Sequence, residues 1–279
     1  MSTRPWRAVE QVMGLPISVA LRGRHAGDRR GHDAWSAVVA ELREVDRVFS
    51  TYRADSVVSR LDRGEMTPAA APPEVREVLA IAERARVESG GAFDVRRRGD
   101  DRVVRLDPSG VVKGWAVQRA AAHLAALRET DYCLGGGGDV VARVVDPQAP
   151  AWQIGVEDPR EPRRLVARVP LRDGAVATSA ETHRGPHVVD ARTGRRPTGL
   201  ASVTVVAPDL TWADIDATAA FAMGTDGLAW LESRPGRSGL VVLDDGTPRV
   251  LGQPARCLPS ASSTPSAGMP FMSGPTIGS

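Results

Sequence analysis

Lysine is almost absent from this sequence: of its 36 basic residues, Lys113 is the only lysine. A chain with this bias uses arginine wherever either basic side chain will serve. Because an ammonium is compact and a guanidinium is broad and planar, the remaining lysine is predicted where only the ammonium fits. Chance retention is the alternative interpretation of Lys113.

Cysteines and long apolar runs are also scarce. Cys133 and Cys257 have no close metal-ligand spacing, so we expect two free thiols rather than a disulfide. Residues 1–11 carry charges without an apolar run, and no stretch approaches the roughly 18 apolar residues of a membrane span. We therefore expect no secretory signal, no membrane partner and a cytoplasmic location.

Charge of one sign is not in excess either. The net charge of +2 provides no long-range field that would attract nucleic acid or a membrane surface. The hydrophobic fraction of 42% over 279 residues is enough to build a sizeable core. The composition predicts one large domain, or two closely packed ones, with no nucleic-acid partner.

The hydrophobic patterns predict helices and strands in no strict alternation. Asp33 is the predicted N-cap of a helix that runs to Phe49, and Pro73 begins a second helix that Gly90 ends. Further helices are predicted over 113–127, 213–223 and from 228, and strands over 14–21, 140–145, 152–157, 165–171, 202–207 and 240–243. This mixture predicts an α+β fold rather than a doubly wound α/β fold.

The last part of the chain differs in composition from the rest. Residues 260–279 are rich in Ser, Pro, Gly and Thr, and such a segment cannot bury a core. We expect residues 1–251 to form the folded domain and residues 252–279 to be a disordered tail.

Two polar groupings could contact a phosphate. The glycine run Gly135–Gly138 before Asp139 would let backbone N–H groups approach a ligand, but taken alone it favours a tight turn between two elements. Asp107, Gly110 and Lys113 surround the start of a predicted helix, where a helix N-terminus and an ammonium attract phosphate. An ordinary capped helix start is the alternative.

Two other groupings could hold a metal or move a proton. Asp214 and Thr218 are four residues apart in a predicted helix, so their oxygens share one face and could bind Mg²⁺. A capping aspartate with a surface threonine is the alternative. His187 could act as a general base beside Asp190, or could be a structural histidine.

The order of eight segments resembles a known family. They are MGLPISVALRG from Met13, FSTYRADSVVSRL from Phe49, GGAFDVRR from Gly90, LDPSGVVKGWAVQRAAAHL from Leu106, CLGGGGDVVA from Cys133, WQIGVEDPR from Trp152, AVATSAETHRGPHVVDARTGRRP from Ala175 and SVTVVAPDLTWADIDATAAFAMG from Ser202. In this order they resemble the FAD:protein FMN transferase family, also called the ApbE family, over about residues 11–245. The resemblance implies an α+β, T-fold-like arrangement of mixed β-sheets with flanking helices and a flavin cleft between two halves.

The resemblance also implies the flavin contacts. The isoalloxazine ring would lie against Met13 and Tyr52, and the phosphates near Asp107 and Lys113. The remaining implied contacts, to the adenosine half and through the backbone, are Ala92, Phe93, Asp94, Val188 and Ala217.

The implied reaction transfers FMN from FAD to a Ser or Thr hydroxyl of an acceptor protein and releases AMP. Mg²⁺ would bind Asp214, Thr218 and the backbone oxygen of Gly110, and His187 would be the base, oriented by Asp190. Acceptors of the family carry an acidic residue before a Ser/Thr-Gly-Ala-Thr-like target. An FAD pyrophosphatase and a flavin-binding protein without turnover are the alternatives.

The chain departs from the family pattern at three positions in loops around this site. The usual asparagine before Gly-Gly-Asp is missing, and Leu134, Gly135 and Gly136 stand there. Ala180 replaces a usual glycine and Ala191 a usual proline. The metal pair and the lysine are intact.

Overall fold

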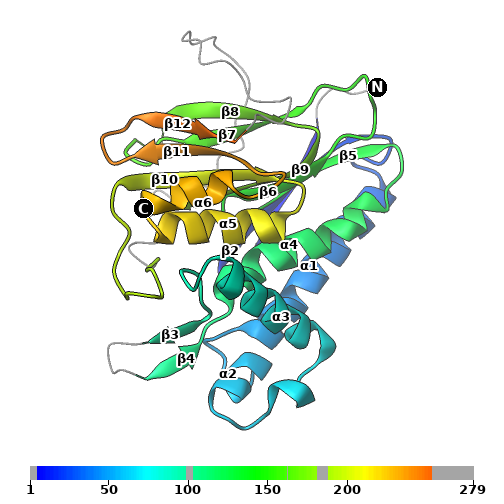
Figure 1. Ribbon diagram of the computed structural model, residues 1–279. Coiled ribbons are helices and arrows are strands. Elements are labelled where there is room, and N and C mark those ends of the chain that lie inside the picture. The colour runs from blue at the N-terminus through cyan, green and yellow to red at the C-terminus, as the bar shows by residue number, and fades with distance from the viewer. Residues whose placement is uncertain (1–4, 99–102, 162, 181–187, 253–279) are drawn as a thin grey trace.

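An eight-stranded antiparallel sheet lies at the centre of the protein, in the strand order β1-β2-β5-β6-β9-β10-β11-β12 (Figure 1). The computed structural model describes residues 5–98, 103–161, 163–180 and 188–252. The strands of the sheet are β1 (Trp6–Val12), β2 (Leu15–Gly23), β5 (Thr130–Gly136), β6 (Asp139–Arg143), β9 (Asp173–Ala180), β10 (Leu200–Ala207), β11 (Ser238–Leu243) and β12 (Pro248–Leu251). Each pair of neighbouring strands is antiparallel, which confirms the α+β class.

Helices cover one face of this sheet. They are α1 (Arg29–Phe49), α3 (Pro73–Glu88), α4 (Ser109–Ala125), α5 (Leu210–Ala222) and α6 (Asp226–Glu232). Helix α4 contacts β5 and β6, and α5 contacts β9 and β10, so these two helices lie directly on the sheet. The larger hydrophobic core fills the space between the sheet and the helices.

Helix α5 is the most enclosed of these helices. Its residues are buried on every side except at Trp212 and Thr218. An apolar circumference of this kind is typical of a helix inside a core. Any polar side chain on α5 therefore needs a partner inside the protein.

A separate hairpin covers the other face of the sheet. It consists of β7 (Trp152–Glu157) and β8 (Leu165–Leu171), which pack on a second, smaller core. Adjacent residues of β5 separate the two cores, because Cys133 belongs to the smaller one and Leu134 to the larger. Cys133 is a buried free thiol, as expected, whereas Cys257 lies outside the described residues.

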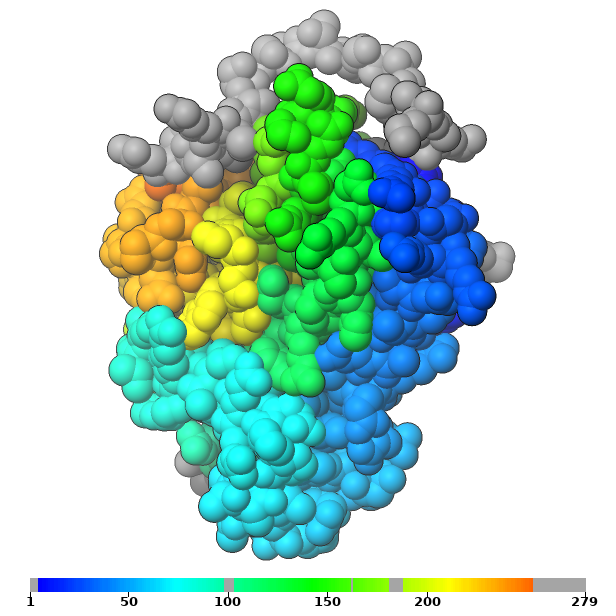
Figure 2. All heavy atoms as spheres, turned by 90° about the vertical axis from the view of Figure 1, so that its right-hand side faces the viewer, coloured from blue at the N-terminus to red at the C-terminus, as the bar shows by residue number. Residues whose placement is uncertain are grey.

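The segment between α1 and α4 forms one end of the molecule. Helix α2 (Val57–Asp62), the 3₁₀-helix η1 (Pro68–Ala70) and α3 lie in the cyan segment, which forms that end in Figure 2. The short hairpin of β3 (Arg96–Arg98) and β4 (Val104–Leu106) projects nearby, below the sheet in Figure 1.

Several element boundaries differ from the predictions. The N-cap of α1 is Asp28, whose Oδ1 accepts a hydrogen bond of 3.0 Å from Gly31 N, and not Asp33. Residues 29–32 extend the helix by a turn that its apolar spacing does not mark. Helix α4 begins before Lys113, at Ser109, and six strands of the described ranges, β1, β3, β4, β5, β9 and β12, were not predicted. Within the described ranges, no helix has the length and apolar character needed to cross a membrane.

Candidate functional site

The only lysine of the chain lies between two aspartates. Lys113 Nζ is 3.0 Å from Asp214 Oδ1 and also forms an ion pair with Asp139 Oδ2. The three residues come from α4, α5 and β6, so the cluster joins two helices to the sheet. That only a compact ammonium fits between these carboxylates stays a prediction.

A glycine allows α4 and α5 to approach closely at this point. A Cβ atom on Gly114 would lie 2.9 Å from both Asp214 Cβ and Leu210 O. The Gly114 backbone N–H donates a hydrogen bond of 3.1 Å to Asp214 Oδ2. One carboxylate oxygen of Asp214 therefore contacts the ammonium of Lys113, and the other contacts the backbone of α4.

The cluster is deeply buried. The side chain of Lys113 is 15% exposed, that of Asp139 2% and that of Asp214 3%. Burial alone would lower the pKa of Lys113, but the carboxylates of Asp139 and Asp214 raise it above its usual range. The ammonium is therefore charged at neutral pH, and the three groups together carry a net charge of −1.

Strand β9 fixes two members of the site. The backbone N–H of Thr178 donates a hydrogen bond of 3.0 Å to Asp139 Oδ1, and the hydroxyl of Ser179 lies 3.1 Å from that of Thr218. Asp139 follows the turn at Gly137 and Gly138, whose φ angles of +59° and +99° favour glycine. Gly135 and Gly136 therefore end β5, and Gly137 and Gly138 form the turn that presents Asp139 to Lys113.

The donor set fits a hard divalent cation. Asp214 offers a carboxylate and Thr218 a hydroxyl on one face of α5, and the surrounding charge is negative. No group of three or more His, Cys, Asp or Glu in the described ranges could hold a metal ion. A cation here would thus need backbone, water or substrate oxygens, the coordination that Mg²⁺ commonly keeps.

Gly110, the implied backbone ligand, lies in the first turn of α4. A Cβ atom at this position would be 3.2 Å from the ring of Phe93. Asp107 precedes the same turn, and its Oδ1 accepts a hydrogen bond of 3.1 Å from Ser109 N. The ring of Phe93 thus lies close to Gly110, and the assignment of both residues to one flavin and metal site stays a prediction.

The segment that contains Asp190 lies against the loop that contains Ala92. The backbone N–H of Ala191 donates a hydrogen bond of 3.1 Å to the Ala92 carbonyl oxygen. Arg192 binds both carboxylate oxygens of Asp190, and these hydrogen bonds lower the pKa of Asp190. His187 lies outside the described residues, so its predicted contact with Asp190 stays a prediction.

The remaining implied flavin residues differ in their surroundings. Ala92, Phe93, Val188 and Ala217 are buried, and Asp94 Oδ1 accepts a hydrogen bond of 2.8 Å from Arg96 N. A second group lies at turns and in loops: Met13 has a φ angle of +57°, and Tyr52 is 98% exposed. An exposed aromatic ring at Tyr52 is free to stack on a ligand.

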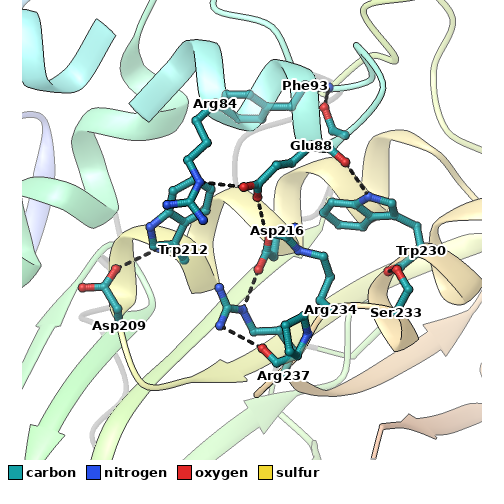
Figure 3. A network of polar contacts seen from close by, with 12 residues as sticks. Arg84, Glu88, Phe93, Asp209, Trp212, Asp216, Trp230, Ser233, Arg234 and Arg237 are labelled. Carbon is teal, nitrogen blue, oxygen red and sulfur yellow. Dashed lines mark hydrogen bonds and ion pairs between the residues drawn. The ribbon is translucent and has the colours of Figure 1, made fainter. Parts of the chain in front are cut away.

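A second ion-pair network, which the sequence did not suggest, holds α5 from another side (Figure 3). Asp216 is fully buried and pairs with Arg237 at 2.7 Å and Arg234 at 3.2 Å. Arg234 also binds Glu88 of α3, which Arg84 contacts at 2.6 Å. Asp214 and Asp216 are two residues apart, and Asp214 pairs with Lys113 whereas Asp216 pairs with Arg234 and Arg237.

Asp139 was named as the residue after the glycine run, but it was not among the predicted site residues. The signal for its role was the single lysine, because a buried ammonium needs carboxylate partners. Gly114 and Ser179 were also missed, since a close approach of two helices and a contact between a strand and a helix have no local pattern.

Most of the chain matches a known protein family. The model of the ApbE family matches residues 13–99 and 96–241 of the chain. The FAD:protein FMN transferase of Haemophilus influenzae is 26% identical over 249 residues, which cover 68% of this chain and 72% of that protein. That of Rhodobacter capsulatus is 31% identical over 160 residues, 54% of this chain and 30% of that protein.

Solved structures share the fold. The ApbE protein of Thermotoga maritima superposes with a TM-score of 0.75 at 23% identity, over 89% of this chain and 97% of that chain. The flavin transferase ApbE of Vibrio cholerae also has a TM-score of 0.75, at 22% identity, over 91% of this chain and 100% of that chain. Because the family model matches most of the chain, the chain belongs to the ApbE family and is an enzyme.

Proposed function

We propose that this protein transfers FMN from FAD to a Ser or Thr hydroxyl of an acceptor protein, in a Mg²⁺-dependent reaction that releases AMP. The family and the names of the relatives support the flavin chemistry. The observation that carries the proposal is the buried cluster of Lys113, Asp139 and Asp214 with Thr218 beside it. Its net negative charge and hard oxygen donors suit a cation that meets a pyrophosphate.

The residues that would hold Mg²⁺ are Asp214, Thr218 and the backbone oxygen of Gly110. Mg²⁺ bound there would supply positive charge against the pyrophosphate. Asp214 is held from α4 by Lys113 and Gly114. Its position therefore does not depend on the cation alone.

In the proposed reaction the acceptor oxygen attacks the phosphorus of the FMN half. A bond forms between that phosphorus and the acceptor oxygen, and the phosphoanhydride bond to AMP breaks. His187 takes the proton of the acceptor hydroxyl, and AMP leaves with its phosphate. A positioned base of this kind contributes roughly 10² to 10⁴ in rate.

The flavin would extend from this cluster toward the loop of Ala92 and Phe93. The ring of Phe93 lies close to Gly110, and the Ala191 N–H donates a hydrogen bond to the Ala92 carbonyl oxygen, which supports a site whose metal and adenosine parts would adjoin. Tyr52 would stack on the ring system from its exposed loop.

The test is incubation of the protein with FAD, Mg²⁺ and a candidate acceptor, followed by intact mass of the acceptor and quantification of AMP. We expect a gain of one FMN group on the acceptor with equimolar AMP, and loss of both with a chelator. The Asp214→Asn variant is the matched control, because it keeps the side-chain shape and removes the charge. AMP and free FMN without acceptor modification would indicate hydrolysis, and neither product would indicate flavin binding alone.

A further inference from the structure

The carboxylate that would bind the cation already has a positive partner. Lys113 Nζ lies 3.0 Å from Oδ1 of Asp214. Because Asp214 is almost completely buried, a charged carboxylate there without a counter-ion would be costly. In the cation-free protein the ammonium of Lys113 therefore serves as the counter-ion of Asp214 and holds its side chain in place.

A cation and this ammonium would share one carboxylate. Oδ2 of Asp214 accepts the hydrogen bond of Gly114 and Oδ1 contacts Lys113, so a cation that binds this carboxylate would lie close to the ammonium. Like charges a few ångströms apart repel strongly where water is excluded. The net charge of the cluster would also change from −1 to +1 if Lys113 stayed in place beside a divalent cation.

Asp139 offers the ammonium a second partner on a different element. Its Oδ2 pairs with Lys113, and its Oδ1 is fixed by the backbone N–H of Thr178 at 3.0 Å. Asp139 belongs to β6 and Asp214 to α5, so Lys113 can lose one partner and keep the other.

We propose that Lys113 is an internal counter-ion that competes with the divalent cation for Asp214, and that Asp139 retains the ammonium when the cation binds. This inference rests on the proposed function, because it takes Asp214 as the carboxylate that holds the cation. It gives Lys113 a role in the protein without cation, as the partner of Asp214, in addition to the implied role near the phosphates.

The experiment measures Mn²⁺ binding to the purified protein without flavin, by electron paramagnetic resonance of the free ion. In Lys113→Met and Lys113→Gln the competitor is absent, and we expect Mn²⁺ to bind about tenfold tighter or more. Each variant should also unfold at a lower temperature without Mn²⁺, and gain more from Mn²⁺ than the wild type does. Lys113→Gln can still donate a hydrogen bond to the buried carboxylates. It therefore tests the competition for Asp214 even if Lys113→Met does not fold.

Arg237→Met is the matched control. Arg237 has the same 15% side-chain exposure as Lys113 and pairs with Asp216 on the same helix, so the variant removes an equally buried positive charge. We expect it to lower the unfolding temperature while Mn²⁺ affinity stays within about twofold, because Asp216 does not hold the cation.

Unchanged or weaker Mn²⁺ binding in both Lys113 variants would overturn the counter-ion role. An equal gain in Arg237→Met would also overturn it, because the effect would then be one of overall charge. If the wild type and all variants bind no Mn²⁺, the cation site of the proposed function is overturned as well. Tighter binding in the Lys113 variants, together with no flavin transfer by the wild type, would leave the counter-ion standing and reject only the transfer.

Discussion

The hydroxyl of Ser179 lies 3.1 Å from the hydroxyl of Thr218, which links the last part of β9 to the proposed cation face of α5. Thr218 is also one of only two residues of α5 that are not buried. Its hydroxyl is therefore contacted by a neighbour, and the residue is partly exposed. These two properties are what a metal-binding hydroxyl requires.

Two substitutions of Thr218 distinguish the contribution of its hydroxyl oxygen from that of its side-chain shape. Thr218→Val keeps the branched side chain but removes the oxygen, and we expect flavin transfer to fall at least about tenfold. Thr218→Ser should recover most of the activity, because it restores the oxygen. Transfer rates at several Mg²⁺ concentrations provide the measurement, and full activity in Thr218→Val would remove Thr218 from the site.

Tyr52 provides a test of ring stacking that is separate from folding. Its side chain is 98% exposed, so Tyr52→Ala should leave the unfolding temperature nearly unchanged. Loss of stacking should weaken FAD binding by about 1 kcal/mol. Tyr52→Phe is the control and should bind FAD as the wild type does, which fluorescence titration can measure. Equal affinity in Tyr52→Ala would place the ring elsewhere.

The network around Asp216 predicts a large loss of stability. Asp216→Ala would leave Arg234 and Arg237 without their buried carboxylate, and breaking a buried pair costs about 3–5 kcal/mol. Glu44→Ala breaks an exposed pair with Arg47 and should barely change the denaturant midpoint. The measurement is the urea midpoint of unfolding of each variant, compared with that of the wild type. Similar midpoints would mean that the network does not hold α5.

Cys133 predicts a thiol that reacts only after unfolding. Burial raises its pKa to about 12, so at pH 8 almost none of it is thiolate. The raised pKa means that the fold favours the neutral thiol. This contribution to stability is full below the ordinary thiol pKa of about 8.5, and is lost as pH rises toward 12.

The measurement is alkylation of a Cys257→Ser variant, which leaves Cys133 as the only thiol. We expect labelling at the rate of unfolding in buffer and at once in denaturant. Rapid labelling of the native protein at pH 8 would show that the second core is open to solvent.

Features that depend on residues close together in the chain could be predicted from the sequence, and contacts between distant residues could not. The helical positions of Asp214 and Thr218 followed from a spacing of four residues, and Pro73 at the start of α3 from its fixed φ angle. Such patterns depend on near neighbours in the chain. Asp33 failed as a cap because Asp28 lies one turn earlier and is the residue that accepts the hydrogen bond.

The sequence by itself determined the family, the α+β class and the importance of the single lysine. Only the tertiary structure decided that Asp139 and Asp214 share the ammonium of Lys113 and that Gly114 brings the two helices together. A buried charge selects its partners by distance in space, and these partners come from β6, α4 and α5, which are far apart in the chain. No local pattern encodes such a meeting, because it exists only after the sheet and its helices have packed.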